Sequence, residues 1–309
     1  MLENVHLEVR DESGFLRLLR DLLSQGVGRL ECDALSIRIP QLKGEMRVEA
    51  GMPFHLAPEL FVQLSGTTVF ELPEEVLTVG PGEVCLIPRG MPHRERIFSS
   101  PERPFHNLVV LHGHDELFFH LAHERPDHRP KGYLRSRLVG DGCEGLLGLL
   151  NGAAELSRGP SPAQRTGIKG FLMAYFSLFL TMLEEAGNGE EREPFPVTRA
   201  RQIVLASIHD PGLTVASVAR EVQLHPDYLS LLFRQATRQS LQAYITRNRF
   251  LRACELLRSS ALNMAQVSEA AGFRDPSYFT RFFRQRQGMT PLAYRRAAGR
   301  KVERWPPAG

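Results

Sequence analysis

Apolar residues recur at helical spacing through the C-terminal third of the 309-residue chain. From Val215 to Val222 they fall at positions i, i+3, i+4 and i+7, which predicts a short amphipathic helix with Thr214 as its N-cap. The same stripe returns 49 residues later, where Asn263 is the N-cap and Gln266 stands at the third helical position, as in a capping box. The sequence therefore predicts a duplicated unit.

Each amphipathic stripe is followed by a second predicted helix that opens with proline. Pro226 and Pro276 lie 50 residues apart, and proline suits a first helical position because the N–H that it lacks would have no partner there. The apolar faces of these helices are formed by Leu229, Leu232 and Phe233, and by Phe279, Phe282 and Phe283. Two short helices joined by a tight turn, the second with an exposed polar face, form the helix-turn-helix pattern.

The polar faces of the two proline-initiated helices supply the candidate DNA contacts. They carry Asp227, Ser230, Leu231 and Arg234 in the first copy, and Ser277, Thr280, Arg281 and Arg284 in the second. From Thr198 onward, 18 lysines and arginines stand against 7 acids, a net charge of +11, whereas the preceding residues hold 20 against 28, a net charge of −8. Nearly all of the later cations are arginine, which favours bidentate contacts with phosphate or guanine.

A longer helix is predicted between the two units. Ser240 can cap a helix that runs to about Ser259, and at 1.5 Å per residue this helix would be about 28 Å long. Successive major-groove faces lie roughly 34 Å apart, so a rigid helix of this length can present both units to one side of DNA. Its arginines, such as Arg249 and Arg252, have two interpretations: contact with DNA, or ion pairs within the protein, for instance with Glu255.

The stretch YITRNRFLRACELL, followed by AAGFRDPSYFTRFFRQRQGMTPLAYR, resembles the DNA-binding domain of AraC-type transcription regulators over about 100 residues that end at Arg296. The resemblance implies two helix-turn-helix units bridged by a long helix, each with a recognition helix in the major groove of operator DNA. The matching positions are Gly272, Phe273, Ser277, Tyr278, Phe279, Arg281, Phe283, Arg284, Gly288 and Pro291.

Two positions depart from the family pattern. Ser268 stands where alanine is usual, which is a mild change, and Arg238 is the larger departure. Arg238 stands where the first unit normally has glycine, the equivalent of Gly288 in the second. A side chain there costs about 1 kcal/mol if the backbone keeps a left-handed conformation. We therefore expect the turn after the first recognition helix to be strained or reshaped.

The acidic N-terminal half has a different pattern. Short apolar segments from about Leu35 to Leu111 are separated by glycine and proline, which predicts a many-stranded β domain. Two helical stretches follow, around 144–156 and 168–186, and the Gly-, Pro- and Glu-rich segment AGNGEEREPFP is typical of a linker.

Two motifs in this half resemble those of the cupin fold, a small double-sheet β barrel that AraC-type regulators often carry as a sensor domain. His55, Glu59 and Gly66 follow the spacing of the first motif, and the run from Gly82 through Pro88 and Gly90 to His93 follows the second. The resemblance predicts that His55, Glu59 and His93 converge on one inward-facing pocket. Metal-binding cupins have further ligands where this chain has Pro53 and Ile97.

The three retained residues have two interpretations. They form the composition of a 2-His-1-carboxylate metal site, but they can equally hydrogen-bond one another or a small ligand. We predict that His55, Glu59 and His93 bind a small ligand. We assign no metal or other cofactor, and the same three residues are the candidates for a metal site.

Two further clusters are ambiguous. Six histidines, His106, His112, His114, His120, His123 and His128, crowd 23 residues and are predicted to lie on the surface. A broad apolar helical face could pack in the core or form a dimer. Its residues are Phe171, Leu172, Tyr175, Phe176, Phe179, Leu180 and Leu183.

Composition excludes several classes of protein. The chain is 42% hydrophobic and 24% charged, which is typical of a soluble globular protein. Its longest apolar run, 171–183, has 13 residues, short of the roughly 20 that span a bilayer. The N-terminus carries acids where a secretory signal needs a basic end, and the four scattered cysteines suit a reducing compartment. We expect a cytoplasmic protein without a membrane span.

These observations predict an α+β multidomain fold, with an N-terminal cupin-like β barrel flanked by helices and a C-terminal all-α double helix-turn-helix domain. The predicted domains are a cupin-like sensor at 1–142, a helical dimerisation segment at 143–186, a linker at 187–197, a DNA-binding domain at 198–298 and a C-terminal tail at 299–309.

The predicted function is a sequence-specific transcription regulator, not an enzyme, that a small ligand controls; sugars are the candidate class at family level. The predicted partners are double-stranded operator DNA, the small-molecule effector, a second copy of the chain and, for an activator, RNA polymerase. Two alternatives stay open: a metal-dependent cupin enzyme, an isomerase or dioxygenase, fused to a DNA-binding domain, and an architectural DNA-binding protein with a vestigial sensor.

Overall fold

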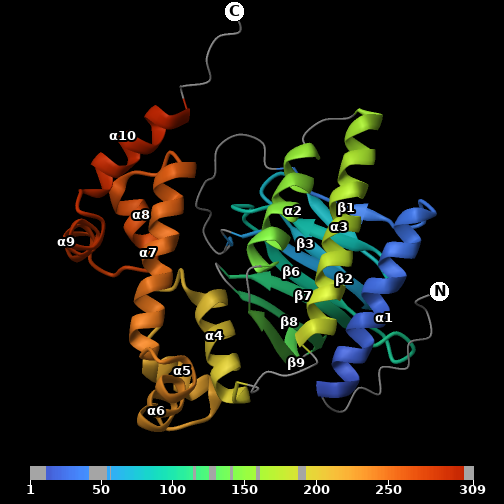
Figure 1. The fold of residues 1–309 in the computed structure, drawn as a ribbon, viewed down its shortest axis with the longest axis horizontal. Coiled ribbons are helices and arrows are strands. Elements are labelled where there is room, and N and C mark those ends of the chain that lie inside the picture. The colour runs from blue at the N-terminus through green and yellow to red at the C-terminus, as the bar shows by residue number, and fades with distance from the viewer. Residues whose placement is uncertain are drawn as a thin grey trace, which may run out of the picture. The chain divides into compact units, whose positions relative to one another are not determined.

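The computed structural model describes residues 12–41, 54–55, 57–113, 116–124, 130–139, 142–157, 161–186 and 193–302. These residues group into two compact units that divide between residues 192 and 193. The first unit contains sheets and helices, and the second is helical (Figure 1). The predicted α+β class is confirmed at this level, and the finer domain bounds stay predictions.

Two sheets form the centre of the first unit. The six-stranded sheet has the order β1-β5-β2-β7-β8-β9 and is antiparallel except for the parallel pair of β1 and β5, and the three-stranded antiparallel sheet has the order β4-β3-β6. The strand bounds are β1 Ile37–Arg38, β2 Glu59–Ser65, β3 Thr67–Glu71, β4 Val76–Val79, β5 Val84–Ile87, β6 Arg94–Phe98, β7 His106–His112, β8 Glu116–Glu124 and β9 Pro130–Val139.

The side chains of β2 divide between two cores, because neighbouring residues of a strand point to opposite faces. Leu60 joins the core beneath the helices, whereas Phe61 joins a second core that contains Phe70 of β3 and Val79 of β4. The three-stranded sheet therefore packs on one face of the six-stranded sheet. Neither sheet closes on itself among the described strands, so the predicted cupin barrel is not shown.

Three helices cover the other face of the six-stranded sheet (Figure 1). They are α1 Glu12–Glu31, α2 Gly142–Leu156 and α3 Pro162–Ala186. The sequence analysis predicted α2 and α3 but not α1, whose Phe15, Leu19 and Leu22 are buried against the sheet at helical spacing. It also placed the last strand near Leu111, whereas β8 and β9 extend the sheet to Val139.

The apolar face of α3 is used inside its own unit. Its side chains that are buried in the shared core are Leu172, Tyr175, Phe176, Phe179 and Leu183. Core packing is therefore confirmed for these residues, and they lend no support to dimerisation through the same face. By length and composition alone, α3 is the one helix of the described part of the chain that could cross a bilayer, with a mean hydropathy of 1.4 over its best window. The expectation of no membrane span rests on the 13-residue apolar run 171–183 and stays a prediction.

The second unit consists of seven helices within residues 193–302. They are α4 Phe195–Ser207, α5 Val215–Val222, α6 Pro226–Thr237, α7 Leu241–Ser259, α8 Met264–Ala270, α9 Pro276–Gln287 and α10 Pro291–Val302. The predicted duplication is confirmed, because α6 and α9 begin 50 residues apart and each follows a short amphipathic helix. The long helix predicted from Ser240 to about Ser259 is α7, and Ser240 caps it.

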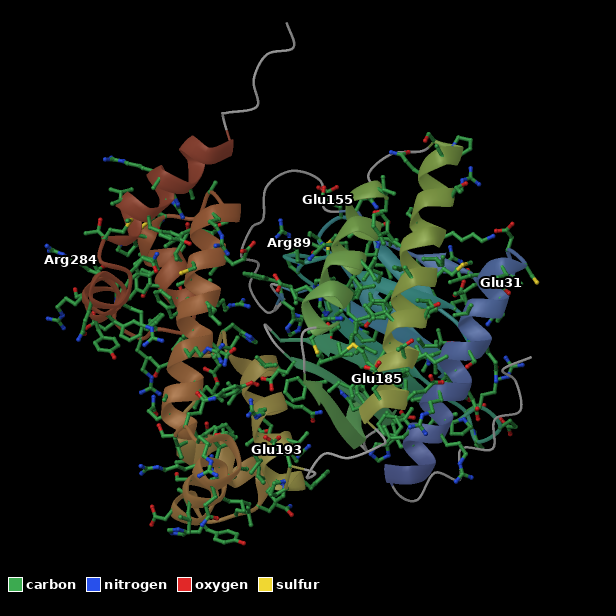
Figure 2. The ribbon with its side chains drawn as sticks, in the orientation of Figure 1. Glu31, Arg89, Glu155, Glu185, Glu193 and Arg284 are labelled. Carbon is green, nitrogen blue, oxygen red and sulfur yellow. The ribbon has the colours of Figure 1, made fainter. Side chains whose placement is uncertain are left out.

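Helix α4 begins inside the segment predicted as a linker. Just before it, Glu193 accepts hydrogen bonds from the Thr198 hydroxyl at 2.9 Å and from Nε of Arg201 at 3.1 Å (Figure 2). The Arg201 guanidinium lies over the rings of Tyr244 and Phe233, 5.0 and 5.5 Å from their centroids. This buried ion pair fixes the start of α4 beneath α6, so residues 195–197 belong to the helical unit.

Candidate nucleic-acid interface and buried polar cluster

Both short first helices begin with a complete capping box. The Thr214 side chain accepts from the backbone N–H of Ser217, and the Ser217 hydroxyl accepts from the backbone N–H of Thr214. Asn263 and Gln266 form the same reciprocal pair at the start of α8. The predicted caps are confirmed, and each box satisfies two backbone donors that a helix start would otherwise leave unpaired.

The first proline-initiated helix, α6, separates its residues as predicted. Leu229 and Phe233 are buried, whereas Asp227, Leu231 and Arg234 are exposed. Ser230 lies at the border, and its hydroxyl donates to the carbonyl of Pro226 at 2.8 Å. The exposed face of α6 therefore offers one acid, one aliphatic side chain and one cation.

The second such helix, α9, presents a more basic face. Ser277, Thr280, Arg281 and Arg284 are all exposed, and Arg284 stands among the side chains that project from α9 in Figure 2. The Thr280 hydroxyl donates to the carbonyl of Pro276 at 2.9 Å.

A close backbone contact joins the second repeat to the end of α4. Gly272, between α8 and α9, has φ of +83°, and a Cβ at this position would run into the backbone carbonyl of Ile208 at the end of α4. Glycine is therefore required here for both its conformation and its size. This contact fixes the turn between α8 and α9 against the end of α4.

Two arginines of the long helix α7 form hydrogen bonds within the protein. Arg249 donates to the carbonyls of Asp210 and Leu213 at 3.1 and 3.0 Å, and Arg252 donates to the carbonyl of Ala270 at 2.6 Å. Of the two interpretations that the sequence left open, the geometry favours intramolecular contacts for these two arginines. By contrast, the side chains of Arg234, Arg281 and Arg284 have no hydrogen-bond or ion-pair partner among the described residues.

The exposed faces of α6 and α9 also carry two tyrosines that the sequence analysis did not assign to them. Tyr228 and Tyr278 lie at the same position of α6 and α9, 50 residues apart, with 54% and 49% of their surface exposed. The ring of Tyr278 stacks on that of Phe282 at 6.0 Å. The sequence contained a signal for this pair, because tyrosine recurs at the 50-residue offset of the two repeats, next to residues that were predicted to contact DNA.

In the N-terminal unit, the structure brings His55, Glu59 and His93 together. Oε2 of Glu59 lies 3.7 Å from Nε2 of His55 and 3.5 Å from Nε2 of His93, and one ligand atom from each residue lies within 4.8 Å of the others. Glu59 and His93 are buried, and His55 is half-buried. On β2, Glu59 alternates with Leu60 and shares the face of Phe61, so the cluster lies between the two sheets.

The electrostatics of the cluster favour a carboxylate between imidazoles. Burial raises the pKa of the Glu59 carboxyl, but the charge of His55 and the hydrogen bond with His93 outweigh burial and hold this pKa below its usual value. Burial lowers the pKa of His93, yet the contact with Glu59 raises it overall. Nδ1 of His93 donates to the carbonyl of Met91 at 3.0 Å, which leaves Nε2 facing Glu59. Metal-binding histidines commonly show the same division of roles.

A second carboxyl of this region was not predicted. Glu95 pairs with Phe70 in the three-stranded sheet, and the Phe70 ring lies 6.0 Å from that of His93. Withdrawal from water, together with the charge of Glu59, raises the pKa of Glu95 to about 7. Its position two residues after His93, on an alternating strand, was the signal. Ile97, two residues further on, is buried, and Pro53 lies outside the described residues.

The prediction of surface histidines is wrong for His112. This residue ends β7, is buried, and has Nε2 at 3.2 Å from the Tyr175 hydroxyl of α3. Burial lowers the pKa of His112 to about 4. His106, His120 and His123 are half-buried on β7 and β8, whereas His114 and His128 lie outside the described residues. The glycine after His112 resembled a loop signal, but it only ends the strand.

Known proteins resemble the C-terminal unit most clearly. Residues 218–297 match the helix-turn-helix domain family. The arabinose operon regulatory protein of Escherichia coli is 34% identical over 106 residues, which cover 34% of this chain and 36% of that protein. In a solved structure, the C-terminal domain of AraT, a response regulator from Geobacillus stearothermophilus, is 33% identical and covers 35% of this chain and 88% of that one, with a TM-score of 0.34.

One relative matches a longer part of the chain. The transcriptional activator NphR of a Rhodococcus species is 27% identical over 226 residues, which cover 72% of this chain and 64% of that protein. A match of this length exceeds the C-terminal unit and so extends into the N-terminal one. The chain spans less than two thirds of the length of the first curated relatives that it matches.

Proposed function

We propose, from the premise that the C-terminal unit carries a helix-turn-helix domain of the AraC type, that this protein is a sequence-specific DNA-binding transcription regulator. The observation that carries the proposal is the repeat of α6 and α9, each with a buried apolar face and an exposed polar face. The unpartnered arginines of these faces are available for phosphate and base contacts, while those of α7 hold the scaffold together.

The two faces suit different bases. Arg281 can donate two parallel hydrogen bonds to O6 and N7 of a guanine, the commonest specific contact in the major groove. On α6, Asp227 suits a cytosine amino group and Leu231 a thymine methyl group, which are weaker recognition elements. We assign DNA contacts also to the other members of the two faces, Ser230, Arg234, Ser277, Thr280 and Arg284. We therefore propose that the second helix-turn-helix repeat contributes more to sequence specificity than the first.

Selection from a random pool of duplex DNA tests this function. The full chain should enrich a defined site with a guanine that depends on Arg281. Retention of duplexes without sequence preference, at an affinity that only salt controls, would instead support the architectural DNA-binding alternative.

For the N-terminal unit we propose a cupin-like sensor in which His55, Glu59 and His93 bind a small effector. Two facing sheets with a polar cluster between them support this proposal. A carboxylate flanked by imidazoles can accept and donate hydrogen bonds to hydroxyl groups, which suits a sugar or another polyol. Native mass measurement of the purified chain tests for a bound small molecule. Loss of that mass in Glu59→Ala and His93→Ala would support the assignment, and its retention in both variants would refute it.

The same cluster favours one alternative. Two imidazoles and one carboxylate within 4.8 Å fit a 2-His-1-carboxylate metal site, which would supply Lewis-acid or redox chemistry to a fused cupin enzyme. The apolar Ile97 at a position where metal-binding cupins have a ligand argues against it. Stoichiometric iron, manganese or zinc in the purified protein, lost in His55→Ala, would favour this alternative over the sensor.

The remaining parts of the proposal follow from the proposed function as a transcription regulator. We propose a cytoplasmic protein that acts as a homodimer on an operator, without catalytic activity, and that contacts RNA polymerase if it activates transcription. The relatives with printed functions are regulators, which supports this assignment. Light scattering of the purified chain tests the dimer, and a monomer at micromolar concentration would contradict it.

A further inference from the structure

A concave site lies on the helix side of the six-stranded sheet, away from the polar cluster between the sheets. It is a groove of about 700 Å³ between the end of α1, the edge strand β1 and the first turns of α3. Ile37 of β1 pairs with Val84, whose side chain belongs to the core beneath the helices, so the groove and the polar cluster lie on opposite faces of the sheet. Small-molecule sites commonly have volumes of roughly 300–1,000 Å³.

The floor of the groove is apolar. Leu30, Ile37, Ile39, Ile168 and Met173 line it, and all of them belong to the core of the unit or pack against it. These side chains are held by the sheet and by two helices, so the floor is preformed. An aliphatic or aromatic body of a ligand would find the same surroundings here as in the core.

The polar rim carries positive charge. Lys169 is paired with Asp33, with Nζ at 2.7 Å from Oδ1, and Gln41 donates to Ser157 at 2.8 Å. Arg165 is exposed at the same rim and has no side-chain partner among the described residues. The single rim acid is thus already neutralised, and the guanidinium is left to bind a planar anion through two parallel hydrogen bonds.

We propose that this groove binds an amphipathic carboxylate, with its apolar body on the floor and its carboxylate on Arg165. This site is separate from the proposed effector site at Glu59 and does not depend on it. Because α3 and β1 form its walls, a bound carboxylate would contact both the helix layer and the edge strand of the sheet.

Calorimetry of the full chain with sodium decanoate tests the proposal. Decanoate should bind at one site per chain, decanol more weakly, and decyltrimethylammonium not at all. Arg165→Gln should weaken decanoate binding about tenfold, the loss of one charge-assisted contact. Arg17→Gln is the matched control, because Arg17 is also exposed but lies on α1 outside the groove.

A blocking variant separates this groove from unspecific apolar binding. Gly170 lines the groove, and a Cβ built there meets no atom within 4 Å. Gly170→Leu should therefore fold, since leucine favours a helix interior over glycine, and should abolish binding. No binding of decanoate by the wild-type chain, equal binding of the cationic detergent, or wild-type affinity in both Arg165→Gln and Gly170→Leu would each overturn the proposal.

Discussion

Arg238 and Gly288 hold the same left-handed turn at the ends of α6 and α9, with φ of 60° and 75°. Each donates its backbone N–H to a carbonyl one turn back, to Arg234 and Arg284 respectively, at 2.9 Å. The turn after α6 therefore keeps the left-handed backbone conformation, although its residue is arginine and not glycine. The strain that a side chain meets in this conformation is about 1 kcal/mol or slightly more.

This pair predicts stability changes of opposite sign. Arg238→Gly should raise the free energy of unfolding by about 0.5 kcal/mol, because relief of strain outweighs the greater freedom of glycine in the unfolded chain. Gly288→Ala should lower it by about 1 kcal/mol. A Cβ at Gly288 meets no atom within 4 Å, so this loss reports the backbone alone. Urea unfolding measures both, and a destabilised Arg238→Gly would contradict the interpretation.

Arg281 is predicted to read one base. Arg281→Ala should cost about 1 to 3 kcal/mol on the selected site and relax the preference at a single position, because a bidentate contact with guanine is lost. Binding to a panel of single-base variants measures this. Arg258 provides the control, because it pairs with Glu255 at 2.6 Å and lies outside the recognition faces. An unchanged binding motif in Arg281→Ala would refute the assignment.

DNA binding should depend strongly on salt. If six or more phosphates are neutralised by the arginine-rich unit, affinity falls roughly 10³-fold between 50 and 200 mM salt. Arg284→Ala should reduce the slope of log affinity against log salt by about one if this residue contacts a phosphate. Fluorescence anisotropy with a labelled duplex measures the slope. A nearly flat salt dependence would exclude the proposed set of phosphate contacts.

His112 should make the N-terminal unit sensitive to acid. Its pKa is lowered to about 4 when folded, against 6.5 for an unperturbed histidine, so the unfolded chain takes up the proton first as pH falls. The contribution is present above pH 6.5 and is lost progressively between pH 6.5 and 4, by up to about 3 kcal/mol. His112→Gln, which keeps a partner for Tyr175, should flatten this part of the curve of unfolding free energy against pH. A variant curve as steep as that of the wild type would contradict this.

Local signals made the C-terminal unit predictable. The capping residues Thr214 and Asn263, and the prolines at the start of α6 and α9, act within one helical turn, so the sequence alone located the helices. The roles of Arg249 and Arg252 could not be predicted, because both bind backbone carbonyls of other helices or turns. Such partners leave no trace in side-chain spacing.

The N-terminal unit was harder to predict, because its pairings are distant along the chain. The convergence of Glu59 and His93 was predicted only through two motifs that resemble a known fold, since these residues are 34 positions apart. Burial of His112 depends on α3, which begins 50 residues later at Pro162. Strand β8 is buried along most of its length and therefore lacks the alternation that predicts strands. The side chains that α1 buries are separated from their partners in α3 by the whole sheet sequence.

A hydroxyl-radical footprint of the full chain on its selected duplex tests most directly whether two equivalent units read one side of DNA. We predict two protected segments about 10 base pairs apart on the same face, because α7, which has 19 residues and is therefore about 28 Å long, connects the two helix-turn-helix repeats. Arg281→Ala should weaken protection at one segment and leave the other at saturating protein. A single protected segment, or uniform protection with no periodicity, would contradict the account.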